Sequence, residues 1–135
     1  MIVKGPFETS DWHAEQPFEQ HDDVSLGRVT MTKTFHGGLT ATSTVHLTVV
    51  TTPVEESKAY VAVERIEGTL NGRAGSFVVQ HNAASDRGTQ SLRISVVPDS
   101  ATGELRGLRG EMDIEITEDG AHSYVFDYTL EGPAH

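Results

Sequence analysis

The sequence has no cysteine among its 135 residues, few basic side chains and only short apolar runs. Without cysteine, disulfides, zinc–thiolate sites and thiol catalysis are excluded. Ten Lys and Arg stand against twenty Asp and Glu, which gives a formal net charge of -10. Because nucleic acids and anionic membranes bind clustered basic charge, we expect neither as a partner.

The apolar runs are too short for a membrane span. The longest wholly apolar run, Ala59 to Val63, is far below the ~20 residues of a transmembrane helix. The first residues, Met1 to Pro6, do not resemble the apolar region of a secretory signal. We therefore expect a cytoplasmic protein, and the length predicts one domain over residues 1–135.

The dominant pattern is the alternation of apolar and polar residues, which is typical of half-buried β-strands. An Asn71-Gly72 pair lies inside one alternating stretch, and this dipeptide favours the type I′ turn of a β-hairpin. A further strand is expected around Phe7 to Trp12, and Pro6 and Pro17 place it at an edge or at the closure of a sheet. The other alternating segments lie around residues 29–35, 45–49, 60–80, 92–96, 112–117 and 122–130.

Eight strands separated by short turns, with little helix, predict an all-β fold. We expect a small antiparallel β-barrel that is closed or nearly closed. The interior of an eight-stranded barrel is wide enough to be filled by side chains or to hold one small ligand. The acidic and polar residues 13–23 are expected to form a loop across one mouth of the barrel.

The expected hairpin brings one acidic and one basic side chain together. If Asn71-Gly72 is a two-residue turn, Leu70 pairs with Arg73, and the register places Glu64 and His81 diagonally, about 7–8 Å apart at Cα. Buried carboxyl and imidazole groups have shifted pKa values and can transfer protons. Alternatively, the two groups only satisfy each other's hydrogen bonds. The face that we expect to point inwards is Tyr60, Ala62, Glu64, Ile66, Phe77, Val79 and His81.

Aromatic side chains are the candidates for the wall of a ligand cavity, although the same residues would form the core of a packed barrel. The histidines show no spacing typical of metal ligands, so we expect no metal site, and we expect no cofactor. The candidate ligand-binding residues are Trp12, Tyr60, Phe77, Tyr124, Phe126 and Tyr128.

Three segments resemble an uncharacterised bacterial family, domain of unknown function 3224. They are the hairpin of residues 60–81, the turn and Leu-Gly repeat of residues 96–110, and the closing aromatic strand of residues 122–130. The resemblance covers roughly residues 5–132, and Ala101 stands where we expect a glycine. It implies a barrel similar to that of allene oxide cyclase, a type that often forms oligomers and includes cofactor-free cyclases and isomerases.

Together, these features predict a barrel that binds a small, largely apolar organic molecule and isomerises or cyclises it, with Glu64 or His81 as acid/base. One alternative is a non-catalytic binding or carrier protein that uses the same cavity. Another is a packed barrel that acts as an oligomeric interaction module. Apolar Val61 and Val63 on the expected outer face favour a partner surface, and we expect a homo-oligomer.

Overall fold

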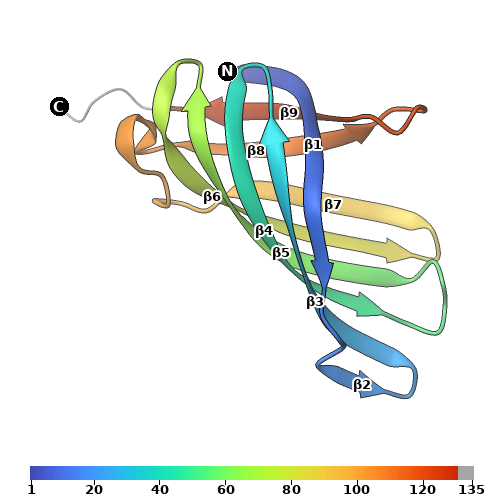
Figure 1. The fold of residues 1–135 in the computed structure, drawn as a ribbon. Helices are drawn as coiled ribbons and strands as arrows, with labels where there is room; N and C mark the ends of the chain where they lie inside the picture. The colour runs from blue at the N-terminus through green and yellow to red at the C-terminus, as the bar shows by residue number, and fades with distance from the viewer. Residues whose placement is uncertain (131–135) are drawn as a thin grey trace.

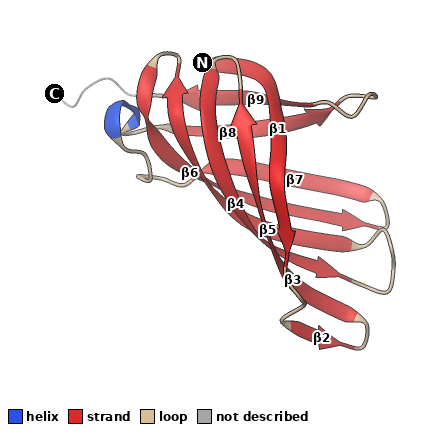
Figure 2. Ribbon diagram, in the orientation of Figure 1, coloured by secondary structure: helices blue, strands red, loops and turns tan. Residues whose placement is uncertain are grey.

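The computed structural model describes residues 1–130, whose strands form one continuous antiparallel sheet (Figures 1 and 2). One short 3₁₀ helix, η1 (Gly103–Leu105), interrupts the strands. Within residues 1–130, no helix has the length and apolar character needed to cross a membrane. The strands are β1 (Ile2–Ala14), β2 (Glu19–His21), β3 (Val24–Phe35), β4 (Leu39–Thr51), β5 (Lys58–Leu70), β6 (Arg73–Asp86), β7 (Thr89–Val96), β8 (Arg109–Ile116) and β9 (His122–Thr129).

The sheet closes through its first strand. The first half of β1 pairs with β9 and the second half pairs with β3, so β1 and β3–β9 form a closed eight-stranded barrel with β2 outside it. Pro6, which has no N–H to donate, lies in this closing strand opposite Ser123. The predicted all-β barrel of about eight strands is confirmed.

The hairpin of β5 and β6 has the predicted register. Asn71 and Gly72 have φ angles of 47° and 82°, as a type I′ turn requires, and Leu70 pairs with Arg73. Only glycine adopts such angles without cost, and asparagine tolerates them better than most residues. The local turn chemistry therefore sets which side chains of both strands share a face.

The inward and outward faces of this hairpin are also as predicted. Glu64 and His81 are 1% and 4% exposed, whereas Val61 and Val63 are 56% and 50% exposed. Because side chains alternate between the two faces of a strand, one turn places the acid and the imidazole inside the barrel together.

The expected loop over residues 13–23 is wrong. Residues Glu19–His21 form β2, which pairs with the start of β3 and projects beyond the barrel (Figure 1). The hairpin turns at Asp22 and Asp23, whose φ angles are 49° and 67°. Aspartate tolerates this left-handed conformation, so a two-residue turn forms here without glycine.

The two ends of the barrel differ. At the closed end, the segment around η1 packs Leu105 and Leu108 into the core, and each is 1% exposed. At the open end, formed by loops 52–57, 87–88 and 117–121, β7 and β8 diverge after only two residue pairs (Figure 1). Leu92 and Ile116 continue the inward alternation of these strands, yet they are 43% and 66% exposed. The barrel is therefore splayed at its open end.

Candidate functional site

Four polar side chains form a layer across the barrel interior. Lys33, Ser43, Glu64 and His81 come from the neighbouring strands β3, β4, β5 and β6. Each is at most 6% exposed. Lys33 lies directly opposite Ser43 in the β3–β4 register, and Glu64 and His81 occupy diagonal positions of the β5–β6 register. Four consecutive strands of the sheet thus place these four side chains at the same depth of the barrel.

Glu64 is the centre of this layer. Lys33 Nζ and His81 Nε2 both contact Glu64 Oε1, at 3.3 and 2.8 Å. The hydroxyl of Ser43 donates to the other carboxylate oxygen, Oε2, at 2.6 Å. Both carboxylate oxygens therefore have partners, as a buried charge requires.

The partners of Glu64 favour its ionised form. Burial alone would raise its pKa, but the hydrogen bond from His81, the positive charge of Lys33 and the hydrogen bond from Ser43 together hold the pKa below its usual value. An ionised carboxylate can only accept hydrogen bonds. His81 must therefore donate from Nε2, which leaves Nδ1 as an unprotonated acceptor whenever the imidazole is neutral.

His81 Nδ1 lacks a partner. Among residues 1–130, it is the one buried side-chain nitrogen or oxygen with no hydrogen-bond partner. Such orphaned groups are rare because burial without a partner costs about 1–3 kcal/mol. The position calls for a ligand or a water molecule.

A cavity of about 190 Å³ lies beside the polar layer, towards the open end. Its wall includes Lys33, His81, Tyr60 and Trp12, together with apolar side chains such as Met31 and Leu47. Lys33 and His81 are thus part of the cavity wall, and Glu64 contacts both.

Tyr60 and Trp12, both predicted as ligand-binding residues, lie in this wall. Burial, followed by the negative charge of Glu64, raises the pKa of Tyr60, so its hydroxyl stays protonated at neutral pH. The Tyr60 ring lies 6.2 Å from the His81 ring, measured between centroids. Trp12 is 63% exposed and stands at the rim. The structure therefore brings these two residues together with His81.

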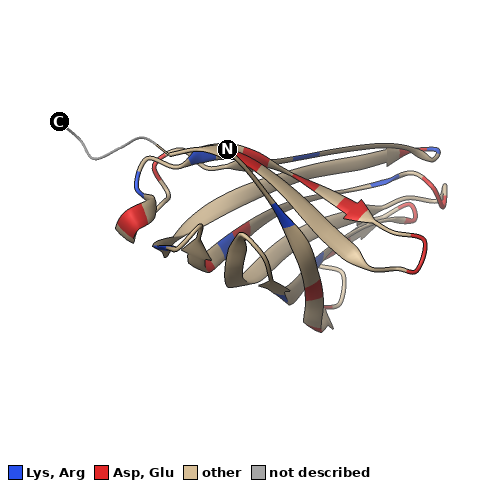
Figure 3. Ribbon diagram, turned by 90° about the horizontal axis from the view of Figure 1, so that it is seen from above, with Lys and Arg blue, Asp and Glu red and all other residues tan. Residues whose placement is uncertain are grey.

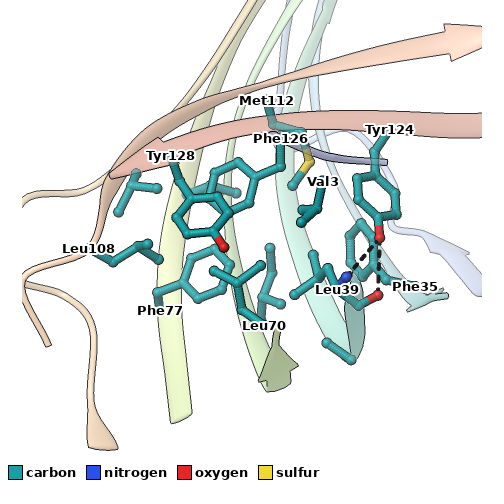
Figure 4. Close-up of a cluster of buried hydrophobic side chains, with 14 of the residues drawn as sticks. Val3, Phe35, Leu39, Leu70, Phe77, Leu108, Met112, Tyr124, Phe126 and Tyr128 are labelled. Carbon is teal, nitrogen blue, oxygen red and sulfur yellow. Dashed lines mark hydrogen bonds between the residues drawn. The ribbon is translucent and has the colours of Figure 1, made fainter. Parts of the chain in front are cut away.

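The other four predicted ligand-binding residues lie in the packed half of the barrel. Phe77 stacks on Phe126 at 5.7 Å and Phe126 stacks on Tyr128 at 5.3 Å, centroid to centroid (Figure 4). The Tyr124 hydroxyl accepts from Leu39 N–H at 3.0 Å and donates to a backbone carbonyl at 2.7 Å. Within the described chain, the cavity wall includes none of these four residues.

Sequence reasoning missed Lys33 and Ser43. A signal was present, because Lys33 continues the apolar alternation of Met31 and Phe35, and Ser43 continues that of Val45. A charged residue at an inward position of a strand needs a buried counter-charge. Glu64 is that counter-charge.

Larger hollows lie on the outer surface. One of about 420 Å³ covers the outer face of β4–β7 and is lined by side chains that include Val61 and Val63. Among residues 1–130, no three histidine, aspartate or glutamate side chains gather closely enough to hold a metal ion. The buried polar layer and the cavity beside it combine buried polar groups with an inward-facing apolar wall, and we take them as the candidate site.

Comparisons with known proteins place this barrel in a family. A family model described as "Protein of unknown function (DUF3224)" matches residues 3–128. The solved structure of a protein of unknown function of the DUF3224 family from Shewanella oneidensis MR-1 is 39% identical, with a TM-score of 0.91 over 98% of each chain. No curated protein matches the chain. The chain thus belongs to the DUF3224 family of proteins of unknown function.

Proposed function

We propose that the barrel binds a small, largely apolar organic molecule in the cavity beside His81. The observation that carries this proposal is the orphaned, buried Nδ1 of a histidine that forms part of the cavity wall. Apolar side chains such as Met31 and Leu47 offer a surface for the body of the ligand. The few polar groups would fix its orientation.

The cavity volume limits the size of the ligand. An engineered apolar cavity of about 150 Å³ holds one benzene molecule. The cavity of about 190 Å³ therefore suits a ligand of that size or slightly larger, well below the ~300 Å³ at which pockets for drug-sized molecules begin. The divergence of β7 and β8 supports an entry route at the open end.

We further propose that the protein is a cofactor-independent isomerase or cyclase of the cytoplasm, and the chemistry of the wall supports the reaction. With Glu64 ionised and bound to Nε2, neutral His81 has its free lone pair on Nδ1 and can act as a base towards a bound molecule. In this scheme, His81 would be the catalytic residue. Glu64 would be a positioning residue that selects the tautomer and stabilises the imidazolium, as the carboxylate of a catalytic triad does.

Binding is tested by screening small aromatic and alicyclic molecules with ligand-observed NMR. A Leu47→Phe variant narrows the cavity, and a Val61→Phe variant introduces the same side chain on the outer face. We expect binders whose signal disappears in Leu47→Phe and persists in Val61→Phe. An absence of binders, or binders that Leu47→Phe leaves unchanged, would contradict the proposal.

A carrier protein would use the same cavity without turnover. Glu64→Gln and His81→Ala separate the two functions once a ligand is known, because an enzyme loses turnover and a carrier has none to lose. Equal turnover in both variants and in the wild type would exclude acid/base catalysis by these residues.

A second candidate function is a homo-oligomeric interaction module. The observation in its favour is the pair of exposed apolar side chains, Val61 and Val63, on the outer face of the central strand β5. Exposed apolar patches commonly mark interaction sites. Light scattering of the wild type and of Val61→Asp/Val63→Asp tests this function: an assembly that the double substitution dissociates supports it, and a wild-type monomer contradicts it.

A further inference from the structure

The cavity wall carries two nitrogens that share one support. Lys33 Nζ and His81 Nε2 contact the same oxygen of Glu64 at 3.3 and 2.8 Å, so they lie within about 6 Å of each other. Both side chains line the cavity. A small molecule in the cavity would therefore lie beside both side chains.

Lys33 has hydrogen-bonding capacity to spare. An ammonium group has three N–H donors. Glu64 accepts one of them, and the ring faces of Phe7 and Phe35 lie 5.0 and 5.9 Å from Nζ. Aromatic faces attract a cation, but they are weak substitutes for an oxygen acceptor. Lys33 can thus donate a hydrogen bond to an oxygen atom of a ligand, and His81 lies beside it as a base.

The charges around the cavity favour a neutral ligand. Lys33 and Glu64 already balance each other. The Lys33 charge at the wall opposes a cation, and acidic residues around the open end oppose an anion (Figure 3). The loops of the open end contain Glu55, Glu56, Glu118 and Asp119 against one basic residue, Arg87, and the β2–β3 turn next to loop 52–57 adds Asp22 and Asp23.

From this geometry we infer that the site enolises a small, neutral carbonyl compound, with His81 as the base and Lys33 as the group that stabilises the oxyanion. The inference rests on the proposed function and names its substrate class. In the step, His81 Nδ1 removes a proton from the carbon next to the carbonyl group. The C–H electron pair forms a C=C bond to the carbonyl carbon, and the carbonyl π pair moves to oxygen.

Returning the same proton to another carbon of the enolate completes an isomerisation. A β,γ-unsaturated ketone, for example, becomes its conjugated α,β isomer, with no net oxidation and no co-reactant. Each charge that develops meets an existing opposite charge: the enolate oxygen meets Lys33, and the imidazolium meets Glu64. Such preorganised charges are a principal source of catalysis.

The test uses two probes that match the cavity in size. The conversion of 3-cyclohexen-1-one to 2-cyclohexen-1-one is followed by absorbance, and the exchange of the α-protons of cyclohexanone into deuterium oxide is followed by NMR. We expect wild-type protein to accelerate both. Lys33→Met should lower the rates by about 100- to 1,000-fold, and His81→Gln by about 100- to 10,000-fold. Lys4→Met, at an exposed position of β1, is the matched control and should leave the rates unchanged.

One comparison needs no variant and so does not depend on the folding of one. Phenol resembles an enol, and toluene has the same shape without the oxygen. We expect phenol to inhibit wild-type turnover at a concentration at least 10-fold lower than toluene does. Equal inhibition would contradict a role for Lys33 and His81 in binding oxygen.

The failure of the inference is distinguishable from the failure of the proposed function. If toluene and cyclohexanone bind, as judged by ligand-observed NMR, but neither probe reacts, the cavity is a binding site and the enolisation is overturned. Reaction at an unchanged rate in Lys33→Met overturns the assigned role of Lys33. If none of the molecules binds, the proposed function itself fails.

Discussion

Substituting Glu64 by glutamine should destabilise the fold far more than the same substitution at the surface. Glu64 is 1% exposed and accepts hydrogen bonds from Lys33, His81 and Ser43. Glutamine keeps the shape, but it has one acceptor oxygen and no charge. The Lys33 ammonium, in a side chain only 5% exposed, would lose its buried counter-charge.

The expected loss follows from this environment. Removing one partner of a buried ion pair typically costs about 3–5 kcal/mol, because an uncompensated charge remains. For a chain of this size, that corresponds to a fall in Tm of roughly 10–20 °C. The chain contains a matched surface pair, Glu8 and His36, with side chains 66% and 48% exposed and an N–O distance of 2.7 Å. Glu8→Gln should cost only about 0–1 kcal/mol.

Denaturant unfolding at neutral pH, supported by calorimetry, measures both variants against the wild type. Lys33→Met/Glu64→Gln should be less destabilised than Glu64→Gln alone, because the double variant buries no unpaired charge. Equal losses for Glu64→Gln and Glu8→Gln would refute the view that the buried ion pair holds this layer together. The same view would be refuted if the loss of stability in Lys33→Met/Glu64→Gln equalled the sum of the losses in Lys33→Met and in Glu64→Gln.

Three further predictions concern acid stability, the packed half and the hairpin turn. The lowered pKa of Glu64 means that its ionised form contributes stability above its ordinary pKa, and this contribution disappears as pH falls through the lowered value. The stability gap between wild type and Glu64→Gln should therefore narrow in urea titrations at progressively lower pH, and a constant gap would contradict this. Phe77→Ala should cost about 3–5 kcal/mol while the purified variant, kept below its Tm, retains any affinity for small ligands; an affinity lost along with stability would place Phe77 in the site. Gly72→Ala should cost about 1 kcal/mol because its φ angle is 82°, although the space around it is open, and a neutral effect by chemical denaturation would count against strain in the turn.

Sequence patterns were sufficient to predict the barrel and the register of its central hairpin. Alternation indicates which residues share a face, and Asn71-Gly72 sets the pairing of the two strands that flank it. These two local signals placed Glu64 and His81 inside the barrel, where the structure joins them by a 2.8 Å hydrogen bond. Both signals depend only on residues that are close in the sequence, so they can be interpreted without knowledge of the tertiary structure.

Sequence patterns could not predict how the interior is divided into a packed half and a cavity. Alternation specifies a face but not the depth along the barrel, so Tyr60 and Phe77 were equivalent candidates for the cavity wall. Whether an inward side chain at a given depth is packed or lines a cavity depends on two tertiary features. One is how far β7 and β8 stay paired, and the other is the segment around η1, whose leucines fill the closed end. The role of Lys33 depends on β3 lying two strands from Glu64, which is a property of the closed sheet order.

A crystal structure of the wild-type protein soaked with phenol would show directly whether the cavity beside His81 holds a ligand. We expect electron density for one ring in the cavity lined by Met31 and Leu47, with its oxygen within hydrogen-bonding distance of Lys33 Nζ or His81 Nδ1. A cavity filled by the side chains of Tyr60 and Met31, with His81 Nδ1 bonded to a protein group and no phenol bound, would contradict it.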